Sequence, residues 1–334
     1  HLLNKRDYRF NIAARNHYNR NKLDELPNAV QNLYSSYWGS SSLVPSNDYM
    51  FVEGKAIGLV RGFVSEGFYT VNDFRYENGQ YILKEGIPDI TKALTATYMH
   101  PFNIPNGQTA FPGAAKFRDV NNSGTVDLDD ATCLGEVMPR HTGSFQLNFN
   151  YKNFDLSSNF NWTAGGKVYN VAAMINASGQ EFDGIGAQRT SWVADTYKVY
   201  NVNSSGDLYA VTDPNELNAL NANAKYHLPY HQSGITSSEW LEDGSYLRLQ
   251  TLTLGYTLPH TVLNKIHIEK LRIYLTATNL FTITGYSGID PEVNATPTGQ
   301  SGFYSNLRVF PTLNMDFGTY PRARTFTLGA NITF

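Results

Sequence analysis

The sequence predicts an all-β protein, a segment of a transmembrane antiparallel β-barrel with about seven strands and long extracellular loops. Three observations favour this fold class. The stretch 326–334 is apolar at every second residue and small and uncharged in between, so it forms a strand with one oily and one polar side. Its length suits a tilted membrane-spanning strand of about 9–11 residues. The connections between the predicted strands alternate between short and long, and the composition is rich in aromatic residues and poor in charge.

The composition bounds the class of protein. The chain has 334 residues, with 27 Gly, 22 Tyr and 19 Phe, and only 16% are charged, against about a quarter in ordinary globular domains. A formal net charge of -3 gives no reason to expect a nucleic-acid partner. The chain contains no run of about 18 apolar residues, so the sequence predicts no transmembrane helix. No Gly-x-Ser-x-Gly sequence, phosphate loop or Rossmann fingerprint occurs, so we expect neither an enzyme nor a catalytic residue.

The N-terminal part of the chain predicts two strands and a long loop. The first strand covers about 7–19, because alternate residues on one face are apolar: Tyr8, Phe10, Ile12, Ala14 and Tyr18. A second strand is expected at about 57–70, in a stretch with several glycines. Residues 71–142 are turn-rich and have no sustained period, so we expect them to form a long extracellular loop.

A tight hairpin is the clearest local signal. Apolar residues alternate through 144–151 and again through 154–162, and Lys152-Asn153 supplies a two-residue turn between them. A second long loop is expected over 164–243, a stretch rich in Asn, Gly, Ser and Tyr. The sequence therefore predicts two antiparallel neighbours that lead into another excursion.

The C-terminal part predicts three more strands. They cover about 245–257, 271–281 and 326–334, with a short connector between the first two and a third long loop at 283–319. Short turns at one end and long loops at the other are typical of outer-membrane barrels. This alternation places the start of the chain on the outer rim with the long loops, and Phe334 at the opposite, periplasmic end. The last strand is expected to pair with 271–281, and an odd number of strands predicts that earlier strands belong to another part of the protein.

Several motifs resemble, in the same order, SusC/RagA-type TonB-dependent transporters of Bacteroidetes outer membranes. They lie at 117–130, 243–256, 271–282, 288–292, 310–311 and 320–322. The stretch 54–67 is similar to that family's Gly-Lys-Pro-Ile-Gly segment, with Ala56 in place of proline. The resemblance covers most of the chain from about Gly54 onward.

The resemblance implies that the chain is the C-terminal part of a barrel of about 22 strands in the bacterial outer membrane. Such a transporter imports oligosaccharides or peptides together with a SusD-like surface lipoprotein and is energised through TonB. The plug domain and the TonB contact belong, by the same resemblance, to an N-terminal remainder. The alternative is a secreted calcium-binding β-rich adhesin or glycan-binding module, which would stay soluble without detergent.

An acidic loop predicts a calcium site. Ca²⁺ takes oxygen ligands from positions 1, 3, 5, 7, 9 and 12 of a twelve-residue loop, with glycine at position 6. Gly124 holds the glycine position. The corresponding ligands are Asp119, Asn121, Ser123, the Thr125 carbonyl, Asp127 and Asp130. The ion would be structural, stiffening a long exposed loop. The alternative is a metal-free loop of Asx turns.

Aromatic residues in the long loops are candidate contacts for cargo or partner, because rings with nearby amides suit sugars, peptides and protein interfaces. The candidates are Tyr200, Tyr226, Tyr230, Trp240, Phe303 and Tyr304. By resemblance these loops face the SusD-like lipoprotein. The alternative is that the rings pack the loops together.

Two arginines within predicted strands should face the polar lumen. Arg248 and Arg272 are flanked by apolar residues, and on the lipid face each would cost about 2–4 kcal/mol near the midplane.

Overall fold

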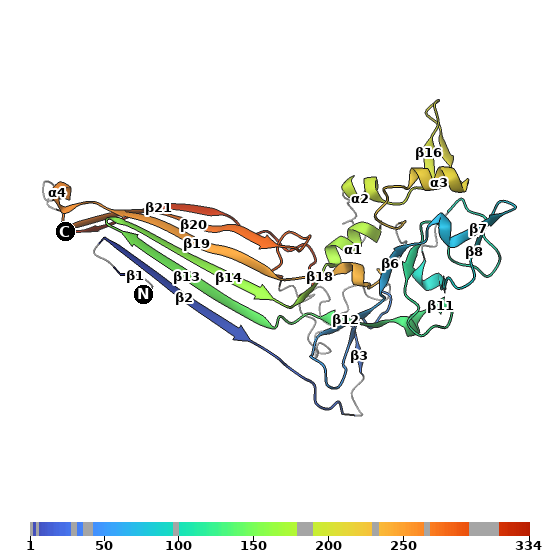
Figure 1. The fold of residues 1–334 in the computed structure, drawn as a ribbon, viewed down its shortest axis with the longest axis horizontal. Helices are drawn as coiled ribbons and strands as arrows, with labels where there is room; N and C mark the ends of the chain where they lie inside the picture. The colour runs from blue at the N-terminus through green and yellow to red at the C-terminus, as the bar shows by residue number, and fades with distance from the viewer. Residues whose placement is uncertain are drawn as a thin grey trace, which may run out of the picture.

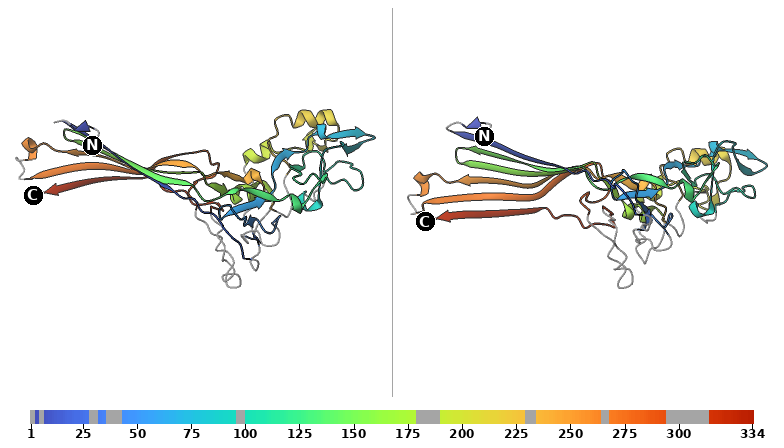
Figure 2. Two further views of the ribbon diagram at one scale, coloured as in Figure 1. Left: turned by 60° about the horizontal axis from the view of Figure 1, so that its bottom comes forward. Right: turned by 90° about the horizontal axis from the view of Figure 1, so that it is seen from below.

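The computed structural model describes residues 3–4, 7–27, 32–35, 43–95, 100–178, 190–228, 234–263, 268–293 and 314–334. They form one long sheet and, beyond one end of it, a body of short strands and helices that we call the outer body (Figure 1). Figure 2 shows the sheet from two further sides as a single twisted layer. No helix in the described part of the chain is long and apolar enough to cross a membrane.

The long sheet has seven strands, and every pair of neighbours is antiparallel. In spatial order they are β1 (Leu3–Asn4), β2 (Tyr8–Tyr18), β13 (His141–Tyr151), β14 (Phe154–Ala164), β19 (Tyr246–Thr257), β20 (Lys270–Thr284) and β21 (Thr325–Thr333). The predicted hairpin is confirmed, because β13 and β14 pair along their whole length. Lys152 adopts a φ of 51° in the tight turn between them. The terminal strand pairs with β20, as predicted.

The connections lie at the two ends of the sheet according to their length. Short ones join β1 to β2, β13 to β14, and β19 to β20, the last containing α4 (His260–Leu263). The other three, which we call the first, second and third outer connections, run over 19–140, 165–245 and 285–324. They lead to the outer body, so the predicted alternation of short turns and long loops is confirmed.

One predicted strand of the barrel is wrong. Residues 57–70 form β5 (Leu59–Gly62) and β6 (Ser65–Phe68), which belong to small sheets in the outer body. Leu59 and Val60 are both buried, so this stretch lacks the single oily face of a barrel strand. A Cβ on Gly62 would lie 2.3 Å from the carbonyl oxygen of Thr236, so this glycine serves close packing against another connection. The first outer connection therefore begins at residue 19 rather than 71.

The seventh strand of the sheet is β1, which changes the expected position of the chain's start. β1 pairs with β2 through Leu3 opposite Phe10 and Asn4 opposite Arg9. It therefore lies at the end of the sheet that carries the short connections, where β21 also ends, on the edge of the sheet opposite β21 (Figure 2). The prediction that the chain starts on the outer rim with the long loops is wrong.

The two faces of the sheet differ in polarity along continuous rows. On one face, paired residues of six strands make a row of large apolar side chains: Phe10, Phe149, Leu156, Leu254, Leu275 and Leu328. Most of these side chains are exposed, Leu328 to 75%. On the opposite face, the neighbouring row holds only amides and hydroxyls: Asn11, Asn148, Ser157, Thr253, Thr276 and Thr327. An exposed apolar face of this extent is what a lipid-facing barrel wall presents.

Aromatic side chains mark both ends of the apolar face. At the short-connection end, Tyr8, Tyr151, Phe154 and Tyr256 stand in one row. At the other end, the rings of Tyr18 and His141 are in tilted contact with centroids 4.9 Å apart, and His141 stacks on Trp162 at 6.4 Å. The 11 residues of β2 connect the two groups. At about 3.3 Å per residue and a tilt of about 40°, they are about 25 Å apart along the membrane normal, the height of an apolar band between aromatic girdles.

The outer body is built from paired short strands and helices. Its four-stranded sheet contains β3 (Leu33–Tyr34), β4 (Tyr49–Met50), β5 and β12 (Thr132–Glu136). The two-stranded pairs are β6 with β10 (Ala115–Phe117), β7 (Phe74–Glu77) with β8 (Gln80–Leu83), β9 (Asp89–Ile90) with β11 (Thr125–Val126), β15 (Lys167–Tyr169) with β18 (Leu241–Asp243), and β16 (Tyr200–Val202) with β17 (Leu208–Ala210). Its α-helices are α1 (Val171–Ser178), α2 (Thr190–Asp195) and α3 (Pro214–Leu220).

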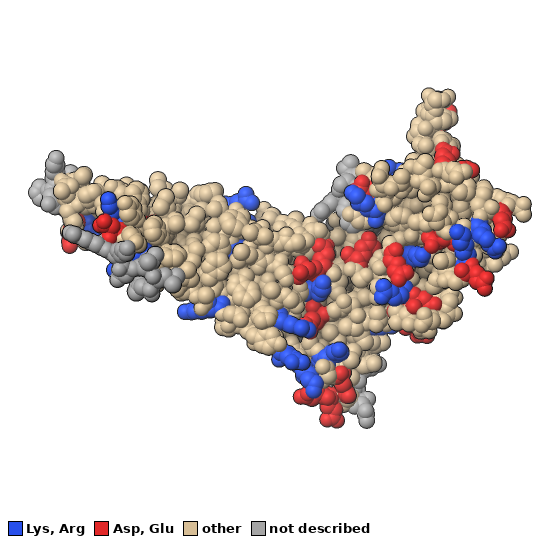
Figure 3. Space-filling view, viewed as in Figure 1, with Lys and Arg blue, Asp and Glu red and all other residues tan. Residues whose placement is uncertain are grey.

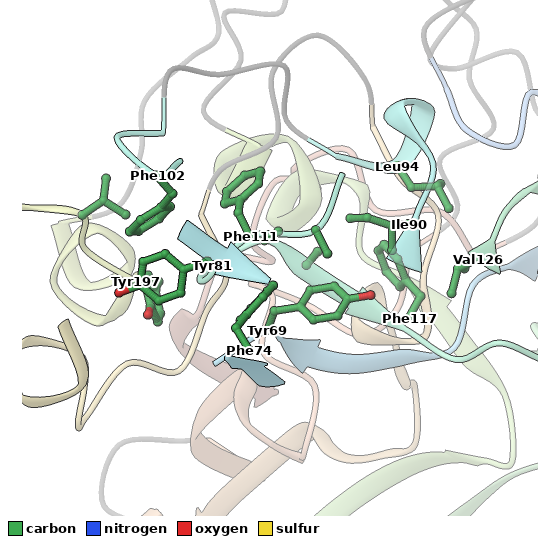
Figure 4. Packing of buried hydrophobic residues seen from close by; sticks show 14 of the residues in the cluster. Tyr69, Phe74, Tyr81, Ile90, Leu94, Phe102, Phe111, Phe117, Val126 and Tyr197 are labelled. Atoms are coloured by element: carbon green, nitrogen blue, oxygen red, sulfur yellow. The ribbon is translucent and has the colours of Figure 1, made fainter. Parts of the chain in front are cut away.

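Two aromatic-rich cores hold the outer body together. One, drawn in Figure 4, contains residues of the first and second outer connections. Tyr81 packs against Phe102 within the first connection, and Phe68 packs against Tyr197 of the second. The other surrounds Tyr49, Tyr169 and Trp240. The outer connections therefore form a folded cap with its own cores, and the face of the sheet that Figure 3 shows carries few charges.

Candidate functional site on the polar face and in the outer body

The polar face of the sheet is a wall of neutral hydrogen-bonding groups. The Ser157 hydroxyl donates to the Asn148 side-chain oxygen at 2.8 Å, and the hydroxyls of Thr253 and Thr276 lie 2.9 Å apart. A shallow cavity of about 450 Å³ opens on this face. Its lining is Ala13, Arg15, Ser144, Gln146, Ser157, Asn159 and Thr251. Hydroxyls and amides both donate and accept, so this wall suits a neutral polar ligand or a peptide backbone.

A β-bulge brings Arg248 onto the polar face. The pairing of β19 with β14 skips Gln250, so Leu249 and Thr251 lie opposite the successive residues Phe160 and Asn159, and the pairing with β20 also shifts register between Leu249 and Thr251. The Gln250 side-chain oxygen accepts from Asn161 at 2.8 Å, on the polar side. One extra residue reverses which face each later side chain takes. Arg248 therefore faces the polar side, which confirms its predicted orientation.

Arg248 lies at the centre of a cluster of two cations and two carboxylates. Its guanidinium donates to Asp290 at 2.5 Å, to Glu292 at 3.1 Å and to the Thr282 hydroxyl at 3.0 Å. Arg322 pairs with Glu292 at 2.8 Å. Asp290 and Glu292 open the third outer connection, and Arg322 closes it. The cluster therefore ties both ends of that connection to the wall.

The sequence indicated these positions only indirectly. Asp290, Glu292 and Arg322 fall in motifs that resemble the transporter family, but no spacing rule connects them to Arg248. The structure gives the motifs a shared physical role, because a nearly buried guanidinium needs carboxylates close by.

The predicted orientation of Arg272 toward the polar face is confirmed by a second ion pair. Its Nε and Nη2 donate to the two oxygens of Asp155 at 2.9 and 2.6 Å. Asp155 lies on β14 and Arg272 on β20, so the pair spans the intervening strand β19 at Gly255. A Cβ on Gly255 would lie 2.5 Å from both side chains. This glycine makes room for a bidentate pair across three strands.

The acidic loop folds around its own backbone. Asp119 accepts from the backbone N–H groups of Ser123 at 3.1 Å and Gly124 at 2.7 Å. The buried Asp130 accepts from three backbone N–H groups, those of Val120, Asn121 and Asp127. Within the described ranges, no three His, Cys, Asp or Glu side chains are grouped so as to hold a metal ion. The Asx-turn alternative describes these contacts, and the calcium site stays a prediction.

The remaining predicted ligands lie in the same loop. Asn121 accepts from the Ser123 N–H at 2.8 Å, and the Ser123 hydroxyl donates to the Thr125 carbonyl at 2.8 Å. Asp127 accepts from the N–H of Asp129 at 2.8 Å. The loop is fixed to the outer body by the pairing of Thr125 and Val126 with β9.

The candidate aromatic contacts do not come together. Tyr200 is exposed on the β16–β17 hairpin. Tyr226 is half-buried, and its carbonyl accepts from the Tyr197 N–H at 2.9 Å. Trp240 is 2% exposed and belongs to the second core, which puts its ring out of reach of a ligand. Tyr230, Phe303 and Tyr304 lie outside the described residues.

A protruding hairpin offers an apolar surface that the composition of the loops did not reveal. β16 and β17 project from the outer body (Figure 1). The pairs Tyr200 with Ala210 and Val202 with Leu208 share one face of this hairpin, and Leu208 is 70% exposed. Isolated apolar residues on a surface are ordinary, but an exposed apolar face on a projecting element is a candidate for a protein interface.

An ion pair between two partly buried side chains lies in the outer body. Lys116 donates to Asp73 at 2.8 Å, and both side chains are less than one-fifth exposed. Asp73 also accepts from the Thr70 backbone N–H at 2.7 Å. Burial raises the pKa of Asp73, but the hydrogen bonds from Lys116 and Thr70 outweigh it, so the pKa is lowered.

The chain resembles receptors and transporters of known description, although no family model matches it. It is 26% identical to TonB-dependent receptor P3 of Formosa agariphila over 332 residues, 99% of this chain and 27% of that protein. It is 30% identical to TonB-dependent receptor P26 of the same organism over 66% of this chain and 20% of the relative. TonB-dependent receptor SusC of Bacteroides thetaiotaomicron is 27% identical over 65% of this chain and 17% of the relative.

A solved structure has the same fold. The RagAB peptide transporter matches 99% of this chain and 28% of the transporter chain, with a TM-score of 0.59 and 18% identity. The chain thus spans about a quarter of the length of the relatives that it matches most fully.

Proposed function

We propose, from its homology to TonB-dependent receptors of the SusC/RagA type, that this chain supplies wall strands and outer loops to a transporter that imports oligosaccharides or peptides. The main observation that supports this proposal is that the sheet has one apolar and one polar face. Its apolar face is bounded by two aromatic girdles, and its opposite face is a wall of amides and hydroxyls. A channel wall needs both faces, whereas a soluble sandwich buries its apolar one.

The wall favours cargo that hydrogen-bonds without carrying much charge. The described lining of the cavity contains one charged residue, Arg15, among hydroxyl and amide side chains. Neutral sugars and peptide backbones both fit this chemistry, so the choice between glycan and peptide rests on measurement. No catalytic role is proposed, because the relatives are receptors and transporters.

The partner that best fits the outer body is a SusD-like surface lipoprotein. The relatives include SusC and a transporter of the RagAB complex. The apolar face of the β16–β17 hairpin supports a contact here, because Val202 and Leu208 are exposed on a projecting element. Coupling to TonB is assigned to the remainder of the transporter.

Uptake measurements test this function. The complete transporter should fractionate with the outer membrane, show heat-modifiable migration, and support uptake of labelled oligosaccharide or peptide that stops when TonB is removed. A chain that stays soluble without detergent would instead support the adhesin alternative.

The hairpin supplies a test of the partner. Leu208→Asp should reduce co-purification of the lipoprotein encoded with the transporter. Val262→Asp is the matched control, since Val262 is 50% exposed on α4 at the opposite end of the sheet. Equal co-purification by both variants would remove the hairpin from the interface.

Calcium binding by the acidic loop is a separate proposal. It is supported by the twelve-residue spacing of oxygen ligands from Asp119 to Asp130, with Gly124 at a φ of 86° in the turn. Addition of Ca²⁺ to metal-free protein should raise the melting temperature of the outer body. The variants Asp119→Ala and Asp127→Ala should abolish the increase. A parent protein whose melting temperature ignores Ca²⁺ and EDTA would leave the Asx-turn loop as the correct description.

A further inference from the structure

A pocket of about 350 Å³ opens where β2 leaves the sheet. Its walls come from the end of β2 and from two later stretches of the first outer connection. Hydrogen bonds fix these three parts together. The Asn19 N–H donates to the Arg140 carbonyl at 2.9 Å, and the Ile57 N–H donates to the Asn21 side-chain oxygen at 2.7 Å. The pocket is therefore a feature of the folded backbone rather than a chance gap between side chains.

The pocket is strongly cationic. Its basic lining residues are Arg20, Lys22, Lys55 and Arg140, all exposed. Glu136 is the one carboxylate that lines it, and it pairs with Arg140. Lys22 pairs with Asp24 at 2.9 Å. Among the described residues, no carboxylate forms an ion pair with Arg20 or Lys55, so two cations remain for a ligand. Figure 3 shows basic side chains along the lower edge of the molecule, where the sheet meets the outer body, with acidic side chains next to them at its lowest point.

The pocket lies at the level of the outer aromatic girdle. Tyr18 lines it, is 59% exposed, and its ring contacts that of His141. Arg20 and Lys22 lie two and four residues after Tyr18, and Arg140 directly precedes His141. Tyrosine and tryptophan rings settle at the headgroup level of a bilayer. The cations therefore stand just outside that level, on the side of the outer body.

We propose that this pocket binds the phosphate group of a lipid in the outer leaflet of the outer membrane. Arginine and lysine together suit phosphate, the first as a planar fork and the second as a point charge. Tyr18 belongs to the apolar face of the sheet, so a ligand reaches the pocket from the lipid side, whereas cargo meets the polar face. Basic pockets beside a membrane bind lipid headgroups in this way. The proposal rests on the proposed function only for the placement of the outer body outside the cell.

Native mass spectrometry of the complete transporter in detergent tests this site. The added probes are lipid A that carries phosphate, lipid A from which phosphate has been removed, and inorganic phosphate. The test variant is Arg20→Gln with Lys55→Gln, and the control is Lys84→Gln with Lys92→Gln, two exposed lysines elsewhere in the first outer connection. The test variant should bind phosphorylated lipid roughly 30-fold more weakly, since each basic residue near a membrane is worth about 1 kcal/mol. The control should bind like the parent.

Three outcomes would overturn the proposal. The test variant could bind phosphorylated lipid as tightly as the control, or the parent could bind lipid without phosphate equally well. Inorganic phosphate could also displace the lipid at equal concentration, which would make this a site for a free ion. Membrane fractionation and heat-modifiable migration of the same samples separate these outcomes from failure of the proposed function. A protein that inserts and transports but ignores the lipid phosphate contradicts only this inference.

Discussion

Replacing Arg248 with methionine removes the cation that fixes the third outer connection to the sheet. The side chain is 3% exposed and pairs with Asp290, which is 8% exposed, and with Glu292. The other cation near Asp290 is Arg322, whose Nε lies 3.9 Å from the carboxylate, beyond hydrogen-bond distance. The variant therefore leaves a buried carboxylate without a close cation.

The expected cost follows from this burial. Removing one partner of a buried ion pair costs about 3–5 kcal/mol, because the remaining charge stays desolvated. Arg322→Met is the matched control. Its side chain is 43% exposed, and an exposed pair contributes at most about 1 kcal/mol. The two variants remove the same kind of side chain from the same cluster, so burial is the main difference between them.

Hydrogen exchange of the complete transporter in detergent measures the effect locally. The Glu292 N–H donates to Asp290 at 2.9 Å and reports opening of the cluster. Arg248→Met should speed its exchange at least about a hundredfold, since each 1.4 kcal/mol is a factor of ten. Asp290→Asn added to Arg248→Met should restore part of the protection. Equal exchange rates in the Arg248 and Arg322 variants would refute the argument from burial.

Three other substitutions test the sheet and the outer body. Gly255→Ala should lower the stability of the sheet by about 2–4 kcal/mol, from overpacking and the lost Arg–Asp pair, whereas Gly285→Ala, whose Cβ meets nothing within 4 Å, should be nearly neutral in denaturant unfolding. Leu328→Arg on the lipid face should cost about 2–4 kcal/mol more than Thr327→Arg on the polar face, as measured by refolding yield and unfolding in lipid. Asp73 has a lowered pKa in the folded protein, so its ion pair stabilises the outer body above the unfolded value of 3.8 and the benefit is lost as the pH falls below it. The difference in melting temperature between the parent and Asp73→Asn should therefore shrink below that pH, and a constant difference would contradict the assignment.

The strands of the sheet could be predicted because period two is a local signal. A strand with one face in lipid repeats its apolar residues at every second position, and six of the seven predicted barrel strands are found in the long sheet. The stretch 57–70 shows where this reasoning fails. Its glycines and apolar residues also fit a folded cap, and the contact that decides the matter joins Gly62 to Thr236, far away in the sequence. Local pattern carries no information about such a partner.

The candidate site was predictable in orientation but not in its contacts. A guanidinium among apolar neighbours has to face the lumen, so Arg248 and Arg272 could be placed from energetics alone. Their partners Asp290 and Asp155 come from other strands or connections, at separations that no motif specifies. The prediction that Trp240 contacts cargo or a partner fails for a related reason. An aromatic ring in a polar stretch of sequence can lie in a core or on a binding surface, and only the packing of the outer body distinguishes the two.

The β-bulge at Gln250 explains how one strand serves both the sheet and the cluster. Leucines 252 and 254 face lipid, and strict alternation would carry that face to position 248 and put the arginine into the membrane. The sequence shows that the alternation is interrupted, because the leucines at 247 and 249 are out of phase with those at 252 and 254. A phase shift inside an otherwise regular strand predicts a bulge. Without that single extra residue, the third outer connection would have no cation on the wall to which Asp290 could bind.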